Sequence, residues 1–159
     1  TSGDFLKTQG TGANPVWATI GGIDADADGW SYGIATGPLS VSGAVVDWDQ
    51  EFHEGSNISS SSGTLTIATA GWYLVSCAMG NSGSDSTTCT INLRKNTSSV
   101  GARIYWAAAS TTPHYYSASK TWLVECAASD TLDMYGSGVF YGTAGTDGMS
   151  IWTGIRVGA

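Results

Sequence analysis

The sequence predicts an all-β protein, an antiparallel sandwich of two stacked sheets. Apolar runs of strand length, such as GWYLVSC at 71–77 and SIWTGIRV at 150–157, are bracketed by turn residues. No helix-length periodic segment separates these runs. The composition agrees, because 22 glycines and many Ser and Thr residues suit short strands joined by small-residue turns.

The strands are expected at spacings that are typical of β-sandwiches. They lie at 31–36, 44–52, 64–69, 71–79, 88–95, 101–109, 115–127, 131–136 and 148–157. The serine run at 59–62 and the polar segment at 96–99 are expected to be linkers. No helix is predicted, because the alanine run at 107–109 is too short to nucleate one.

Residues 1–30 differ from the rest of the chain. Residues 1–19 are small, polar and turn-rich, and residues 20–30 are rich in Gly and Asp. Such a segment cannot build a core of its own. We therefore expect an extended connector or docking arm at 1–30 and a globular knob at 31–159. Since the first residue is not Met, the chain is expected to be a piece of a longer protein, or else a processed product.

The charge pattern and the length of the apolar runs argue against two classes of partner. The formal net charge is -7, and the 6 Lys and Arg residues are scattered, with an adjacent pair only at 94 and 95. Nucleic acid is not expected as a partner, because phosphate contacts need clustered basic side chains. No membrane insertion is expected either, because no apolar run approaches the roughly 20 residues of a membrane span.

The three cysteines are expected in the core. Strand parity places Cys77, Cys89 and Cys126 on inward faces, where a free thiol behaves as a small apolar group. An odd count in a chain of this length does not indicate a disulfide framework. One bridge, for instance between Cys77 and Cys126, stays open as an alternative. A metal site on these thiols is not indicated, because the chain has no CxxC motif.

Six motifs carry a resemblance to a known family. They are VDWDQEF at 46–52, GTLTI at 63–67, AGWYLV at 70–75, NLRKN at 92–96, LVECAASDTL at 123–132 and SIWTG at 150–154. In this order they resemble the globular head of the complement-component-one-q family, which shares a jelly roll with tumour necrosis factor. The resemblance spans roughly residues 31–158. Ser129 stands where the family usually has Gly, and Val75 and Trp152 replace phenylalanines.

The resemblance implies a TNF-like jelly roll that assembles as a homotrimer, with flat sheet faces packed around a threefold axis. Trp and Tyr together number 14, more than one such core needs. The candidates for a buried trimer contact are Trp48, Trp106, Trp122 and Trp152. The alternative is that these side chains fill the core of each subunit.

A second resemblance lies in the segment GDFLKTQGTGANPVW at 3–17. It is similar to a connector of tailed-bacteriophage fibre and appendage proteins, in which Leu-Lys is followed by Gly-rich turns and Pro-x-Trp. There the connector joins a trimeric stem to a terminal knob. The resemblance implies that residues 1–30 contact other virion proteins.

Two sequence patterns suggest enzyme chemistry, but neither is completed. GWSYG at 29–33 matches the GxSxG elbow of serine hydrolases, which works as a strand-to-helix turn. Here an expected strand follows the motif, so a strand start flanked by glycines is favoured. The carboxylates at 47, 49, 51 and 54 are close in sequence, yet nothing distinguishes a glycosidase acid from a base. The chain is therefore expected not to be an enzyme.

A calcium loop is suggested but not favoured. Asp24, Asp26 and Asp28 alternate before a glycine, as in the first half of a calcium-binding loop. The full loop ends in a bidentate Glu at its twelfth position, where this chain has Ala35. A solvated acidic turn without a bound cofactor is the favoured interpretation.

The receptor-binding candidates lie on loops, where rigid sheets commonly present binding residues. The loops are those around 81–87, 107–116 and 141–148. His114, Tyr115 and Tyr116 form a patch that could stack on sugar rings, with a packed loop-to-strand junction as the alternative.

Together these features favour a non-enzymatic virion structural protein. It would be the trimeric knob of a bacteriophage fibre, spike or capsid decoration, located in the virion and contacting a host surface glycan or protein. The alternatives are a structural cement module and a bacterial secreted or surface adhesin module of the same fold, which would be extracellular or on the cell surface.

Overall fold

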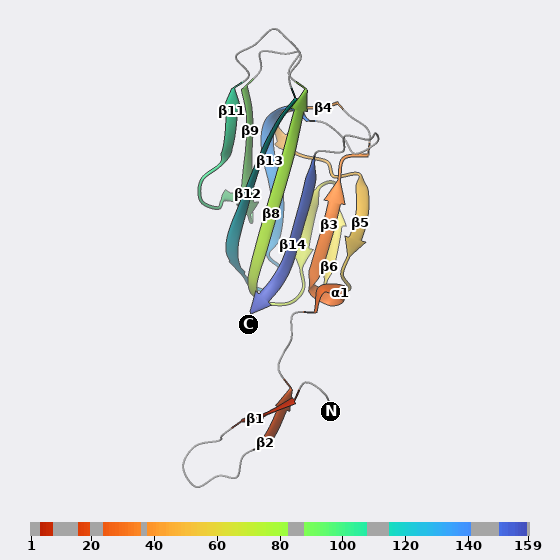
Figure 1. Ribbon diagram of the computed structural model, residues 1–159, viewed down its shortest axis with the longest axis vertical. Helices are drawn as coiled ribbons and strands as arrows, with labels where there is room; N and C mark the ends of the chain where they lie inside the picture. Colours follow the sequence, from red (N-terminus) through yellow and green to blue (C-terminus); the bar gives the residue numbers. More distant parts are fainter. Residues whose placement is uncertain are drawn as a thin grey trace.

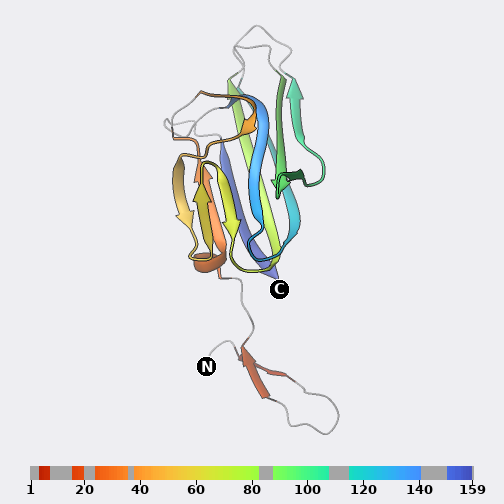
Figure 2. The same ribbon diagram turned by 180° about the vertical axis from the view of Figure 1, so that it is seen from behind.

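The computed structural model describes residues 4–7, 16–19, 24–35, 38–82, 88–107, 115–140 and 150–158. Within them, antiparallel strands build two sheets that face each other, which confirms the predicted jelly-roll sandwich (Figures 1 and 2). The first, here called the β8 sheet, has the order β12 (Tyr115–Cys126), β8 (Gly71–Ser82), β14 (Ile151–Gly158), β3 (Gly29–Gly33) and β5 (Gln50–Glu54).

The second sheet is here called the β13 sheet. Its order is β10 (Ser98–Ser99), β9 (Thr88–Lys95), β13 (Thr131–Phe140), β7 (Thr64–Ile67) and β6 (Ile58–Ser61). Two further strands join it: β11 (Ile104–Ala107) pairs with β9, and β4 (Leu39–Val45) pairs with β13. A separate hairpin of β1 (Asp4–Lys7) and β2 (Val16–Thr19) belongs to neither sheet.

The expected strand at 44–52 is wrong, because the chain changes sheets in its middle. β4 ends at Val45 beside β13, and β5 begins at Gln50 beside β3 in the other sheet. Between them Val46 and Trp48 are buried while Asp47 and Asp49 are exposed. The alternation of a strand therefore continues through a segment that crosses the edge of the sandwich. The crossing is fixed by hydrogen bonds from Val46 N to Met134 O (2.8 Å) and from Ala35 N to Asp49 Oδ1 (2.6 Å).

The expected linkers at 59–62 and 96–99 are also partly strand. β6 buries Ile58 and exposes the three serines that follow, as suits a strand at the end of a sheet. It turns into β7 through Ser62 and Gly63, whose φ values of 49° and 76° are those of a two-residue hairpin turn. β10 is a two-residue pairing with the end of β9.

The core lies between the sheets, and a cluster of aromatic rings fills one part of it. Trp30 and Trp152 meet edge-on with ring centroids 5.9 Å apart, and Trp48 packs on Trp152 at 5.8 Å. Tyr73 lies 6.0 Å from Trp30. Gly154 makes room for this cluster, because a Cβ there would lie 2.2 Å from the Trp30 ring. The large aromatic side chains therefore set the spacing of the two layers at this point.

A short helix, α1 (Ala25–Asp28), lies in the acidic segment for which no helix was expected. Asp24 caps it by accepting a hydrogen bond from Ala27 N. Asp28 then reaches into the sandwich, where Arg156 Nη1 lies 2.6 Å from its Oδ2 and Asn57 Nδ2 donates to its Oδ1 at 2.8 Å. This ion pair joins the helix to β14. Among the residues that the structure describes, no helix has the length and apolarity that crossing a membrane requires.

We expect Asp28→Ala to destabilise the fold by about 3 kcal/mol, because it leaves a largely buried guanidinium without its carboxylate. The side chain of Asp28 is 4% exposed and that of Arg156 is 22% exposed. Urea unfolding at fixed protein concentration measures the change. Asp26→Ala is the matched control: Asp26 is exposed on the same turn, so its loss should shift stability by no more than about 0.5 kcal/mol. Equal effects of the two substitutions would contradict a stabilising role for the ion pair.

Candidate functional site: an apolar sheet face and an aromatic pocket

The outer face of the β8 sheet carries several large apolar side chains. On β8 the side chains of Tyr73 and Val75 point into the core, so Trp72 and Leu74 point outward, with 39% and 41% of their surfaces exposed. Leu123 of β12 is 57% exposed on the same face. A contiguous apolar patch marks an interaction surface more often than scattered exposed residues do.

The strand register aligns these residues in rows across the sheet. Leu123 pairs with Leu74, and Leu74 pairs with Ile155 of β14, which gives a row of three large aliphatic side chains. The next row is uncharged and hydrogen-bonded, with Ser76 Oγ 2.8 Å from Thr121 Oγ1. The rows after these are Glu125, Trp72 and Gly158 at one end, and Ser119, Ala78 and Ile151 at the other. We call these rows the apolar face.

Of the four tryptophans predicted as trimer contacts, the three whose side chains are described do not form this face. Trp152 is fully buried, and Trp48 and Trp122 are each 6% exposed, all three inside the subunit. The predicted contact is therefore corrected for these three, which fill the core as the alternative interpretation held. Trp106 belongs to β11, and its side chain lies outside the described residues.

The residues that do form the face carried a signal in the sequence. A strand with one solvated face alternates between apolar and polar residues, whereas GWYLV at 71–75 is apolar at both parities. Apolar residues at the positions of Trp72 and Leu74 thus indicate a second apolar face, opposite the one that packs in the core. Parity assigns only one of the two faces to the core, and the prediction overlooked the other.

The receptor candidates fall largely outside the described residues. His114 is not described, and neither are the side chains of Tyr115 and Tyr116, whose backbones pair with Ser82 and Asn81 at the end of β12. The predicted loops at 107–116 and 141–148 are likewise described only at their edges or not at all, as is the loop at 81–87. Their receptor role stays a prediction.

The acidic motif at 24–28 has separate roles for its carboxylates. Asp28 is held by Arg156 and Asn57, Asp24 caps α1, and Asp26 points to solvent. Within the described part of the chain, no three His, Cys, Asp or Glu side chains are grouped so that they could hold a metal ion. The three aspartates therefore do not form the half-loop that the spacing suggested.

The candidate hydrolase motif does not form a nucleophile elbow. Residues 29–33 are the strand β3, and Ser31 pairs with Thr153 and His53 in the middle of the sheet. Of the clustered carboxylates, Asp49 accepts from Ala35 N, and Glu54 accepts a hydrogen bond from the hydroxyl of Tyr32. These groups have structural partners on separate segments.

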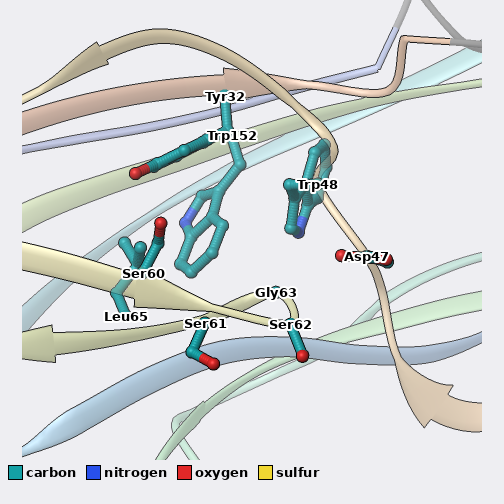
Figure 3. A pocket seen from close by; sticks show the side chains of 9 residues that line it. All are labelled: Tyr32, Asp47, Trp48, Ser60, Ser61, Ser62, Gly63, Leu65 and Trp152. Carbon is teal, nitrogen blue, oxygen red and sulfur yellow. The ribbon is translucent and has the colours of Figure 1, made fainter.

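A pocket of about 100 Å³ opens beside the β6–β7 hairpin. Its floor is buried and aromatic, and its rim carries the exposed hydroxyls and carboxylate of the crossing and the hairpin (Figure 3). The lining residues are Tyr32, Asp47, Trp48, Ser60, Ser61, Ser62, Gly63, Leu65 and Trp152. Burial, and then the hydrogen bond to Glu54, raises the pKa of Tyr32, so its phenol stays neutral. No sequence pattern predicts this pocket, because its parts come from four separate segments.

The geometry rules out the bridge between Cys77 and Cys126. Cys77 pairs with Lys120 on the neighbouring strand, while Cys126 pairs with Gly71, six positions along β8. At about 3.4 Å a residue this separates the two cysteines by about 20 Å along the strands, far beyond the reach of a disulfide. All three thiols are buried, as the parity predicted.

Comparison with known proteins identifies the fold but not the family. No family model matches the sequence, and no curated protein matches it. Among solved structures, murine APRIL is similar with a TM-score of 0.63 and 10% identity, over 82% of this chain and 98% of that one. The Eiger TNF of S. frugiperda is similar with a TM-score of 0.61 and 17% identity, over 82% and 92%. These likenesses show a TNF-like jelly roll and give no support to the fibre-connector resemblance of residues 3–17.

The buried thiols predict slow chemistry in the folded state. Burial, and then the charge of Asp130, raises the pKa of Cys126 from 9.0 to about 11, and burial also raises that of Cys77. At pH 8 the reactive thiolate of Cys126 should be about 100-fold scarcer than in the unfolded chain. Titration with a thiol-specific disulfide reagent should therefore be slow in native protein and should count three thiols in denaturant without reductant. A count of one would reveal a bridge and contradict the structure.

Proposed function

We propose that this chain is a non-enzymatic virion structural protein, the trimeric knob of a bacteriophage fibre, spike or capsid decoration. The observation that carries the proposal is the apolar face, because only contact with another protein surface would remove it from water. The TNF-like jelly roll and the connector-like sequence at 3–17 support it further. In this view residues 1–30 contact other virion proteins, and the knob presents its loops to a host surface.

The distribution of apolar residues supports a closed ring of subunits. Leu123, the most exposed residue of the row, lies on β12, which is 12 residues long and stands at the edge of the β8 sheet. Leu74 and Ile155 lie further in on the same face. If the edge of one subunit packs on the face of the next, both regions are buried at once. Such a contact is heterologous, and it closes into a ring when the rotation between subunits permits.

The same arrangement would protect an exposed strand edge. A long edge strand offers unpaired backbone groups to other chains and invites uncontrolled pairing. Covering β12 with the neighbouring subunit removes this hazard and buries the leucine row. A threefold ring also gives each knob three copies of any loop that touches the host, so weak single contacts add up to useful avidity.

We expect Leu123→Asp to break the assembly, because it places a charge in the apolar contact. Loss of the buried side chain alone should weaken association about 100-fold per interface. Size-exclusion chromatography with light scattering should give about three times the 16.4 kDa chain mass for the native protein, and a smaller mass for the variant.

Phe52→Asp is the matched control for this experiment. Phe52 is 51% exposed, close to Leu123 at 57%, but it lies on β5, at the opposite edge of the β8 sheet from β12. This variant should remain trimeric. A monomeric native protein at micromolar concentration, or equal dissociation of both variants, would overturn the proposed ring.

The virion location has its own test. An antibody raised against the full chain should label phage particles collected from a culture of the organism that carries the gene for this chain. The label should lie on the distal tips of fibres or on the capsid surface. Immunogold electron microscopy makes the measurement, and particles of an unrelated phage serve as the control. Label found on the bacterial surface and not on particles would instead support the adhesin module.

A further inference from the structure

The pocket beside the β6–β7 hairpin has polar groups that the fold itself leaves unused. Among the described residues, the indole nitrogens Nε1 of Trp48 and Trp152 are buried and have no hydrogen-bond partner. Figure 3 shows the nitrogen edge of Trp48 turned toward Gly63 and that of Trp152 turned toward the side of Ser60. A buried indole N–H usually finds an acceptor. Two such donors lie beside one pocket, where an acceptor that enters from outside would find them.

The walls of this pocket are rigid. Gly63 packs so closely against the crossing segment that a Cβ there would lie 2.1 Å from the carbonyl oxygen of Val46. Leu65 and Trp152 are almost fully buried in the core behind it. The donors and the hairpin hydroxyls are therefore held in fixed positions, as a binding site requires.

The arrangement of the rings selects the kind of ligand. Trp48 and Trp152 pack directly on each other, with centroids 5.8 Å apart and planes tilted by 44°, so no group fits between their faces. This argues against an aromatic cage for a cation, which needs open ring faces around the charge. What the rings offer the pocket is their polar edges, which bind oxygen acceptors.

The charged groups around the pocket restrict the class of ligand further. Among the residues that line the pocket there is no Lys or Arg, and Asp47 stands exposed at its rim. A phosphate or carboxylate would meet a like charge without a compensating cation. A neutral hydroxyl is suitable, because it can accept from an indole N–H and donate to Asp47 or a serine oxygen.

We propose that this pocket binds a neutral polyol, the hydroxyl-bearing edge of a terminal sugar residue. A space of about 100 Å³ holds about three waters, so it takes two neighbouring hydroxyls or a hydroxymethyl group and leaves the rest of the ring outside. This proposal adds a ligand class to the proposed host-surface role and rests on that role only for the source of the glycan. Sugar binding by the isolated protein does not depend on it. None of the residues that line the pocket belongs to the receptor loops that the sequence predicted.

The test is a titration of the full-length protein with methyl glycosides of common hexoses and N-acetylhexosamines, followed by the indole N–H signals in a two-dimensional NMR spectrum. After triple-resonance assignment, the signals of Trp48 and Trp152 should shift progressively at millimolar glycoside. Trp122 is an internal control. Its Nε1 already donates a hydrogen bond of 3.3 Å to Ala102 O, and it does not line the pocket. Trp30 is a second, since it is buried and unpartnered but does not line the pocket.

Two pairs of surface variants locate the binding. Asp47→Ala should weaken glycoside binding about tenfold and Ser61→Ala about threefold, because each removes a hydrogen-bonding group at the rim. Glu51→Ala and Ser59→Ala change the same residue types at exposed positions that do not line the pocket, and should bind like the native protein. All four side chains are exposed, so the folded state should tolerate each change.

Three results would overturn the proposal. The Trp48 and Trp152 signals could stay fixed with every glycoside, which would mean that the pocket holds water alone. Tetramethylammonium could shift them in place of the glycosides, or inorganic phosphate could do so, and either would assign the pocket to another ligand class. Light scattering on the same samples reports the trimer independently, so failure of sugar binding is distinguishable from failure of the proposed assembly.

Discussion

Strand β8 is apolar on both of its faces, and this constraint shapes the rest of the molecule. One face, with Tyr73 and Val75, closes the core against the β13 sheet. The other, with Trp72 and Leu74, aligns through the strand register with apolar partners on β12 and β14. A single sandwich can bury only the first of these faces. The second remains a source of free energy for association, because removing apolar area from water is favourable by about 25 cal/mol per Å².

The pair of Asp28 and Arg156 connects α1, just before the first strand of the sandwich, to β14, its last strand. Arg156 lies on β14, between β8 and β3, and its carboxylate partner arrives from α1 at the entrance to the sandwich. Removing charges from water costs free energy, and the pair offsets this cost through short hydrogen bonds, including the one from Asn57. In the proposed assembly, a fixed entry point beside β14 would hold the connecting arm in one place relative to the apolar face.

The sequence predicted the architecture well because local pattern determines it. The runs at 71–79, 88–95 and 115–127 appear as strands with nearly the expected bounds, since alternation and turn residues act over a few neighbours. The crossing at 46–49 was misread because alternation persists where the chain leaves one sheet for the other. β6 was missed because its serines resemble a linker, and only pairing with β7 makes them a strand.

The apolar face and the pocket were harder to predict. They depend on which of several similar side chains, such as the tryptophans, lie next to one another in the fold. The tryptophan count indicated surplus aromatic surface, but Trp48, Trp122 and Trp152 are used in the core. Among the described side chains, Trp72 is the tryptophan on the apolar face. Nothing in the sequence shows that Trp48, from the crossing segment, and Ser61, from β6, line one pocket. Long-range pairing decides such neighbours, and one sequence without its fold does not report it.

The two surfaces lie where they do not compete. The apolar face is richest at β12, β8 and β14, whereas the pocket lies beside β6 and the crossing that leads to β5. Figure 1 shows β11 and β12 along one edge of the sandwich and β5 and β6 along the other. A ring built on the β12 edge would therefore leave each pocket facing solvent, three to a knob. Hydroxyl recognition by a pocket this small would be weak for one sugar, and the proposed ring would convert it into binding to a surface on which the same sugar is repeated.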